Sequence, residues 1–82
     1  MSPTLEKVRA VANDVFGTDS LPDDASMENV EAWDSVNHLN FVMAVEAAFS
    51  VSLDPHDIER MTSLAEAARV IDAKRLPPSR SA

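Results

Sequence analysis

The chain has no cysteine, and only one of its 82 residues is a glycine. Without cysteine it can form no disulfide, no thiolate metal site and no cysteine nucleophile. No apolar run approaches the roughly 18 residues that predict a membrane span, and the N-terminus has none long enough for a signal peptide. We therefore expect a cytoplasmic protein with one small domain, because a chain of this length is too short for two.

Positive charge is also scarce over most of the chain. No lysine or arginine stands between Arg9 and Arg60, and the net charge of the whole chain is −7. The acids in that interval are Asp14, Asp19, Asp23, Asp24, Glu28, Glu31, Asp34, Glu46, Asp54, Asp57 and Glu59. Nucleic-acid binding needs a basic footprint, so this distribution argues against it. An acidic surface of this kind either keeps the domain soluble or steers basic protein partners.

The apolar residues repeat at intervals of three and four, which indicates an all-α chain. A first helix is predicted from Pro3, with Ser2 as its cap, to a point just before the single glycine, Gly17. Residues 17–34 then form a long acidic connection, and loops of this length in compact domains are often functional. The apolar residues expected to pin it to the helices are Leu21, Met27, Val30 and Trp33, with a short helical turn possible near 27–30.

Two apolar stripes run along a second predicted helix at 35–49. The stripe assigned to the core holds Phe41, Val42, Val45, Ala48 and Phe49, and the neighbouring stripe holds Val36, Leu39, Met43 and Ala47. A surface helix needs only one buried stripe, so the second is either further core or a surface for partners. For Met43 taken alone, general burial preferences favour the core.

Two capping signals predict the remaining helices. Asp54-Pro55 begins a short third helix through Ile58 and Met61. Ser63 and Glu66 match the S-x-x-E capping box of a fourth helix, which ends near Lys74 and Arg75. The sequence therefore predicts an all-α four-helix bundle in residues 1–75, with a long first loop and a short third helix. Residues 76–82 are expected to form a disordered tail.

Ser35 lies between the acidic loop and the second helix. Serine is a preferred N-cap residue, so the role of Ser35 could be only to cap the helix. Such a cap contributes about 0.5–2 kcal/mol to stability. A helix N-terminus also favours a bound phosphate, so Ser35 could equally be an attachment point. An enzyme using Ser35 with His38 as base would need an oriented base and a pocket, for which the sequence gives no pattern. We expect His38 to be a partly exposed neighbour, and we expect neither a catalytic site nor a metal site.

The stretch from Trp33 to Phe49 resembles the second helix of acyl carrier proteins. The Asp-Ser-Leu of that family is matched by Asp34-Ser35-Val36, with valine in place of leucine, and its Glu-x-x-Phe ending is matched by Glu46 and Phe49. The order and spacing of the predicted elements are similar from about residue 4 to residue 72.

The resemblance implies that Ser35 carries a 4′-phosphopantetheine arm, derived from coenzyme A, whose thiol holds acyl cargo as a thioester. Asp34 would then help to present Ser35 to a phosphopantetheinyl transferase and its metal ion. Asp34 could also be simply a helix cap, and the two roles are compatible. Further partners would be an acyl- or aminoacyl-loading enzyme and a downstream synthase or transferase. The carrier itself is expected to be a monomer. We expect the partner surface to comprise Val36, Leu39, Met43, Glu46 and Glu31.

Some features depart from carriers of primary fatty-acid synthesis, whose second helix bears many acids. Here Glu46 is the only acid on that helix, and the acidity lies in the preceding loop instead. Trp33 before Asp-Ser is typical of standalone carriers in specialised lipid, polyketide or related pathways. A peptidyl carrier usually has a Gly-Gly pair before the serine, which Ala32-Trp33 lacks. An aminoacyl or peptidyl carrier remains an alternative, as does an unmodified helical interaction domain in which Ser35 is only a cap.

Overall fold

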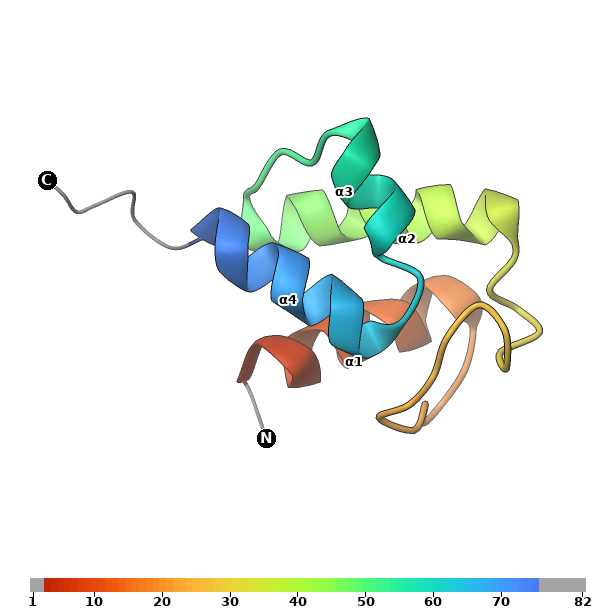
Figure 1. Ribbon diagram of the computed structural model, residues 1–82. Helices are drawn as coiled ribbons and strands as arrows, with labels where there is room; N and C mark the ends of the chain where they lie inside the picture. Colours follow the sequence, from red (N-terminus) through yellow and green to blue (C-terminus); the bar gives the residue numbers. More distant parts are fainter. Residues whose placement is uncertain (1–2, 76–82) are drawn as a thin grey trace, which may run out of the picture.

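The computed structural model describes residues 3–75, and four helices make up this part of the chain. They are α1 (Pro3–Phe16), α2 (Ser35–Phe49), α3 (Pro55–Arg60) and α4 (Leu64–Arg75). The longer helices α1, α2 and α4 form the body of the domain. The short α3 crosses α2 at a steep angle (Figure 1). The all-α architecture, the long first connection and the short third helix are confirmed. The cap predicted at Ser2 and the tail predicted at 76–82 lie outside the described residues.

Local sequence signals explain where the helices begin and end. Gly17 follows α1 with φ 70°, the left-handed conformation that favours glycine. At α3, Asp54 accepts a hydrogen bond from the backbone N–H of Asp57, and the Asp57 side chain accepts one from the backbone of Asp54. At α4, Ser63 Oγ accepts a bond from the backbone N–H of Glu66 at 3.1 Å, as the capping box predicts. The Glu66 carboxylate, however, pairs with arginines of α3 and α4.

The core lies between α1, α2 and α4 and includes residues from the connecting loops. Its largest fully buried side chains are Trp33, Phe41, Met61, Leu64, Ile71, Val8 and Val45. Phe49 is 9% exposed and points inward, as predicted, at the end of α2. The stripe assigned to the core therefore faces the core. None of the helices within residues 3–75 combines the length and apolarity that a membrane crossing requires.

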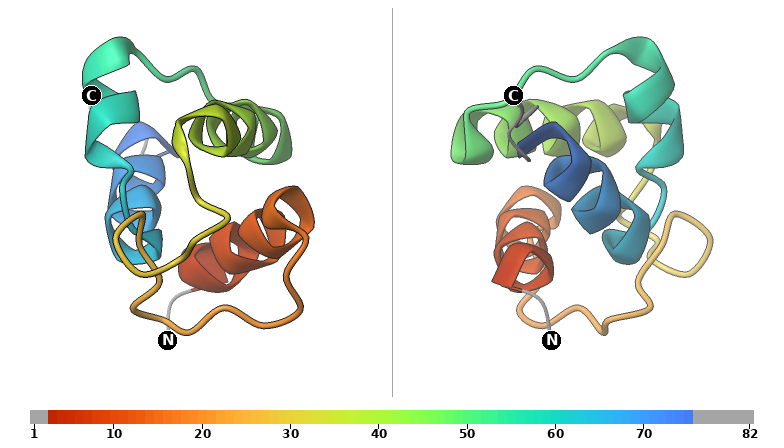
Figure 2. Two further views of the ribbon diagram at one scale, coloured as in Figure 1. Left: turned by 90° about the vertical axis from the view of Figure 1, so that its right-hand side faces the viewer. Right: turned by 60° about the vertical axis from the view of Figure 1, so that its left-hand side comes forward.

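The long first connection is fastened to the bundle at several points. Leu21 and Trp33 are buried, and Met27 and Val30 are partly buried, as predicted. The backbone of this loop also pairs with the segment that leads into α4 and with its first residue, through the bonds Met27 N–H to Thr62 O at 2.9 Å and Leu64 N–H to Ala25 O at 3.0 Å. Figure 2 shows the loop curving around one end of the bundle before it enters α2. The turn predicted near 27–30 is present as a single hydrogen-bonded turn.

Candidate functional site

The cap of α2 is Asp34, and Ser35 is the first residue of the helix. Asp34 has extended backbone angles, and its Oδ1 accepts a hydrogen bond from the backbone N–H of Asn37 at 2.9 Å. Ser35 is exposed. The interpretation of Ser35 as the helix cap is therefore wrong, because the neighbouring aspartate fulfils that role. The serine hydroxyl stands on the first turn of a helix, at its positive dipole end.

Hydrogen bonds on both sides of Ser35 fix the path of the backbone. Asn37 Nδ2 donates to Ala32 O at 2.8 Å, so its side chain reaches back across the start of the helix. The N–H of His38 donates to Asp34 O at 2.7 Å, and that of Trp33 donates to Val30 O at 3.0 Å. The residues before and after Ser35 are thus tied to each other, although the serine itself is exposed.

His38 is buried, so the expectation of a partly exposed side chain is wrong. Only 8% of the residue is accessible. The indole Nε1–H of Trp33 lies 3.0 Å from Nδ1 of His38, and Nε2 of His38 lies 2.9 Å from Ile58 O. An indole N–H can only donate, so Nδ1 accepts and Nε2 carries the hydrogen that is donated to the carbonyl. Both ring nitrogens are occupied, and neither is available as a base for Ser35.

An aromatic cluster fills the space beneath the first turns of α2. The ring centroids of Phe16 and Trp33 are 5.0 Å apart, those of Trp33 and Phe41 5.2 Å, and those of Phe16 and Phe41 5.7 Å. Tilted and edge-on pairs at these separations add about 0.5–1.5 kcal/mol each beyond the burial of their area. Trp33 joins the loop to α1 and α2 in this cluster, so the residue two positions before Ser35 is an anchor.

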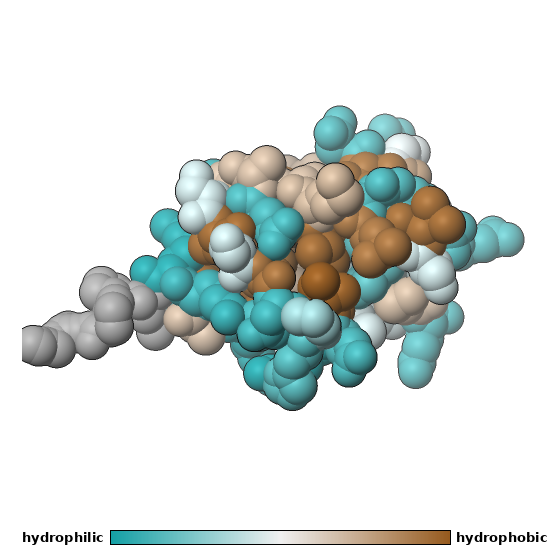
Figure 3. Space-filling view, turned by 90° about the horizontal axis from the view of Figure 1, so that it is seen from above, coloured by the Kyte–Doolittle hydropathy of each residue, from teal (hydrophilic) through white to brown (hydrophobic). Residues whose placement is uncertain are grey.

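Three large apolar side chains of α2 are exposed and form what we call the apolar strip: Val36, Leu39 and Met43. Their exposed fractions are 70%, 56% and 66%. The burial of Met43 that general preferences favour is therefore wrong. Figure 3 shows apolar side chains gathered on one face of the molecule and bordered by polar ones. The strip begins beside Ser35, and its role in docking stays a prediction.

The two acids expected on the partner surface differ in their surroundings. Glu31 is exposed in the loop before α2. Glu46 is partly buried, and its Oε2 accepts a hydrogen bond from the backbone N–H of Leu53 at 2.8 Å. Glu46 therefore holds the segment between α2 and α3, and less of its charge is available to a partner than the sequence suggested.

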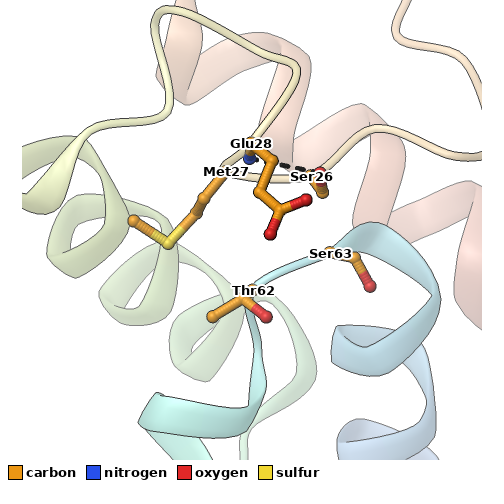
Figure 4. Close-up of a pocket in the computed structure, with 5 residues that line it drawn as sticks. All are labelled: Ser26, Met27, Glu28, Thr62 and Ser63. Carbon is orange, nitrogen blue, oxygen red and sulfur yellow. Dashed lines mark hydrogen bonds between the residues drawn. The ribbon is translucent and has the colours of Figure 1, made fainter.

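A separate open pocket lies where the long loop meets the segment before α4 (Figure 4). It is lined by Ser26, Met27, Glu28, Thr62 and Ser63. One of its edges is closed by the bond from the backbone N–H of Glu28 to Ser26 Oγ at 3.2 Å. None of the side chains that the sequence marked as functional lines this pocket, and we assign no ligand to it.

Within the described residues, Asp54, His56 and Asp57 bring their ligand atoms within 4.8 Å of one another. Two of them already have other partners. Asp54 and Asp57 cap α3, and Asp57 Oδ2 lies 2.7 Å from Nζ of Lys74. The hydrogen bond from Lys74 lowers the pKa of Asp57, and the bond to Asp57 raises the pKa of Lys74. The cluster is therefore explained by an ion pair between α3 and α4.

Comparisons with known proteins bear on the fold. No protein-family model matches the chain, and no curated protein matches it in sequence. The structure is similar to the solution NMR structure of a holo acyl carrier protein from Geobacter metallireducens, with a TM-score of 0.79 and 24% sequence identity. The match covers 89% of this chain and 86% of that one. The chain has the fold of an acyl carrier protein. In this acyl carrier fold, Ser35 begins α2, the longest helix within residues 3–75, and Asp34 caps it at the end of the long loop.

Sequence reasoning missed three contacts around this site. His38 was expected to be a partly exposed neighbour and Glu46 a partner-facing acid, and the bond from Asn37 to Ala32 O was not predicted. Asn37 stands three residues after the cap, a position from which side chains commonly reach back, and this was an available signal. The partners of His38 and Glu46 lie on other elements of the acyl carrier fold, so no local pattern indicates them.

Proposed function

We propose that this chain is an acyl carrier protein that bears 4′-phosphopantetheine on Ser35. The observation that carries the proposal is an exposed serine at the first position of α2, in a chain with the acyl carrier fold, where Asp34 supplies the helix cap. The structural neighbour is a holo acyl carrier protein. We propose a carrier without enzymatic activity of its own, which presents cargo to other enzymes.

The residues around Ser35 suit such an arm. The hydroxyl is exposed, so a transferase can reach it, and a phosphodiester formed there lies at the helix N-terminus, where a negative charge gains about 0.3–1 kcal/mol. Asp34 is exposed beside it, and we propose that it contacts the metal ion of a transferase. When attached, the arm supplies a thiol that holds cargo as a thioester, and the protein supplies attachment and recognition.

Partner recognition is assigned to the apolar strip and to the acids of the loop. The strip starts next to Ser35, and Glu31 lies in the loop that leads to it. Glu46, the single acid of α2, is bound to the backbone of Leu53. Recognition through α2 is therefore mainly apolar, which favours a specialised lipid or polyketide pathway over primary fatty-acid synthesis. We propose a cytoplasmic monomer with one carrier domain in residues 1–75, which meets a phosphopantetheinyl transferase, a loading enzyme and a downstream synthase or transferase.

The deciding experiment is intact-mass measurement after incubation with coenzyme A, Mg²⁺ and a broad-specificity phosphopantetheinyl transferase. The parent protein should gain the mass of one phosphopantetheine, and Ser35→Ala should gain none. Ser52→Ala is the matched control, because Ser52 is an exposed serine elsewhere in the chain, and it should react like the parent. Modification of Ser35→Ala would refute the assignment. A parent protein that stays unmodified, while a reference carrier reacts in the same tube, indicates an interaction domain instead.

The class of cargo needs a second measurement. Holo protein is offered to acyl-loading and aminoacyl-loading enzymes in parallel, and the mass of the loaded product is recorded. An acyl adduct supports the proposed function, whereas an aminoacyl adduct alone replaces it with an aminoacyl carrier. Hydroxylamine should release either adduct, because both cargoes are held as thioesters.

A further inference from the structure

We propose that His38 is a positioning residue for the attachment of the arm. Its imidazole is hydrogen-bonded at both nitrogens, and through these bonds it holds the turn that presents Ser35 in a fixed place against α3. This inference rests on the proposed function, because it concerns the transfer of the arm to Ser35. The residue does not touch the reacting atoms and acts through Trp33 and the backbone of α3.

The first bond fastens the loop to the helix around Ser35. The Trp33 indole is buried, with 1% of the residue exposed, and its Nε1–H donates to Nδ1 of His38 at 3.0 Å. Trp33 precedes Ser35 by two positions and His38 follows it by three, so the bond closes a short loop of chain with the serine inside it. The backbone bond from His38 N–H to Asp34 O at 2.7 Å reinforces the same closure.

The second bond reaches α3. Nε2 of His38 donates to Ile58 O at 2.9 Å, one of the carbonyls near the end of a six-residue helix. Terminal carbonyls of a helix lack a partner within the helix, and a buried one must find it elsewhere. Ile58 O also accepts the N–H of Met61 at 3.2 Å, so the imidazole adds a side-chain donor from α2 to this helix end. His38 thereby links the loop, α2 and α3 at one point beneath the attachment site.

The two hydrogen bonds of the His38 ring matter for arm transfer because Ser35 itself is not held by burial. The serine is exposed, and its position relative to the rest of the protein follows from the residues that hold its two flanks. A substrate segment that is already ordered avoids the entropy cost of being ordered on binding to the enzyme. If either imidazole bond is lost, the turn around Ser35 must become ordered when the transferase binds it. We therefore expect kcat/KM for arm transfer to fall about 3- to 10-fold, largely through a higher KM.

The chain offers variants that separate the two bonds. Trp33→Phe keeps an aromatic ring in the cluster and removes the indole donor. His38→Asn keeps an acceptor near the Nδ1 position, and His38→Gln keeps a donor near the Nε2 position. We expect Trp33→Phe and His38→Gln to lower kcat/KM by similar factors, and the double variant to lose no more than the larger single loss. His38→Asn keeps the bond to Trp33 and loses the bond to Ile58 O, so it should also lower kcat/KM, and its combination with Trp33→Phe should lower kcat/KM further than either change alone.

Transfer kinetics must be separated from stability. Val70→Ala is the control, because Val70 is buried on α4 and not in the segment that holds Ser35. Its truncation should lower the melting temperature without changing kcat/KM at temperatures where the variant stays folded. A second readout needs no transfer at all. In ¹⁵N-labelled parent protein, the His38 ring should show a protonated Nε2 and an unprotonated Nδ1, and the Trp33 indole proton should exchange slowly. His38→Gln should make that proton exchange faster.

Each outcome decides something. Unchanged kcat/KM in Trp33→Phe and His38→Gln, with a modified parent, overturns the positioning role alone. If Val70→Ala loses as much kcat/KM as a His38 variant of the same stability, His38 acts only through stability, and the positioning role is also overturned. The opposite tautomer of His38 overturns the bonding scheme on which it rests. A parent protein that is never modified overturns the proposed function together with this inference, while the ring spectra still report whether the link exists.

Discussion

Asp34 and Ser35 are adjacent, but only the side chain of Asp34 takes part in capping α2. The aspartate side chain satisfies the backbone N–H of Asn37 at 2.9 Å, so the start of α2 depends on it. The serine side chain is exposed on the first turn, and the cap does not involve it. A hydroxyl that the fold does not use can be consumed by a covalent modification at little cost to the fold.

This division changes what alanine should do at the two positions. The sequence assigned a capping loss of about 0.5–2 kcal/mol to Ser35→Ala, and the structure moves that loss to Asp34→Ala. We expect Ser35→Ala to stay within about 0.5 kcal/mol of the parent, as exposed substitutions usually do. Urea unfolding followed by circular dichroism measures both. Asp34→Asn is the control, because asparagine caps equally well; a loss of stability in it would argue against the capping role.

At the far end of α2, Phe49 closes the core. It is 9% exposed, and the charged ends of Lys7 and Arg75 lie 4.9 Å and 5.5 Å from its ring centroid. Phe49→Ala should cost about 3–5 kcal/mol, the usual range for a buried aromatic residue. Thermal melts should show the loss, and Phe49→Leu should recover part of it. A melting temperature equal to that of the parent would mean that α2 turns a different face inward.

At the scale of the element, α2 is a helix with a buried face and an apolar exposed face. Because the apolar strip is solvent-accessible, Leu39→Ala and Met43→Ala should change the free energy of unfolding by no more than about 0.5 kcal/mol. Their effect should appear in slower modification by the transferase or slower loading. Ala73→Ser, an exposed substitution on α4 rather than on α2, is the control. Variants that unfold would place the strip in the core, and variants that react like the parent would remove it from the docking surface of that enzyme.

The loop before α2 is expected to act at longer range. Glu31 is exposed, so its charge contributes to steering a basic partner more than to the fold. Glu31→Lys should slow association with the transferase at low salt and reduce the dependence of the rate on salt. Stopped-flow association at two ionic strengths measures this. Asp14→Lys makes the same change of charge on α1, and an equal effect there would show that net charge matters rather than the position of Glu31.

For the whole molecule, the ion pair between Asp57 of α3 and Lys74 of α4 contributes to the dependence of stability on pH. The bond from Lys74 lowers the pKa of Asp57 below its ordinary 3.8, and Asp57 raises the pKa of Lys74 above its ordinary 10.5. The pair therefore contributes its full stability between those two values. The contribution is lost as the pH falls through the lowered pKa of Asp57, and again as it rises through the raised pKa of Lys74.

Lys74→Met isolates this contribution. The difference in unfolding free energy between parent and variant should be constant near neutral pH and should shrink in acid below 3.8. Urea titrations at a series of pH values measure it. Arg69→Met is the control, since Arg69 pairs with Glu66 on the exposed surface of α4. A parent–variant difference for Lys74→Met that does not change with pH would show that the lysine stabilises the domain by packing alone.

Much of the fold could be predicted from the sequence because helical periodicity and capping residues are local features of the chain. The stripe through Phe41, Val45 and Phe49 defined the buried face of α2, and Gly17 and Asp54-Pro55 marked helix ends. These signals act within a few residues, where sequence spacing and spatial distance agree. The start of α2 was also predicted, although its cap had been assigned to Ser35 as one alternative.

The parts that could not be predicted depend on partners distant in sequence. His38 meets Ile58 across 20 positions, and whether a histidine is buried depends on such a partner. Glu46 meets the backbone of Leu53 only because the chain doubles back after α2. Ser35, the proposed attachment residue, was singled out through a local motif, whereas the contacts of the side chains around it were not predicted.

The buried tryptophan also gives the protein a built-in optical probe. Trp33 is the only tryptophan, and the chain has no tyrosine, so ultraviolet emission excited above the phenylalanine band comes from this one indole. The ring is shielded from solvent, lies against the imidazole of His38 and belongs to a residue two positions before Ser35. Its emission wavelength, lifetime and acrylamide quenching therefore follow the loop beside Ser35 without any added dye. Under the proposed function, loading of cargo and docking of an enzyme at that end of the domain would be timed on the unlabelled protein.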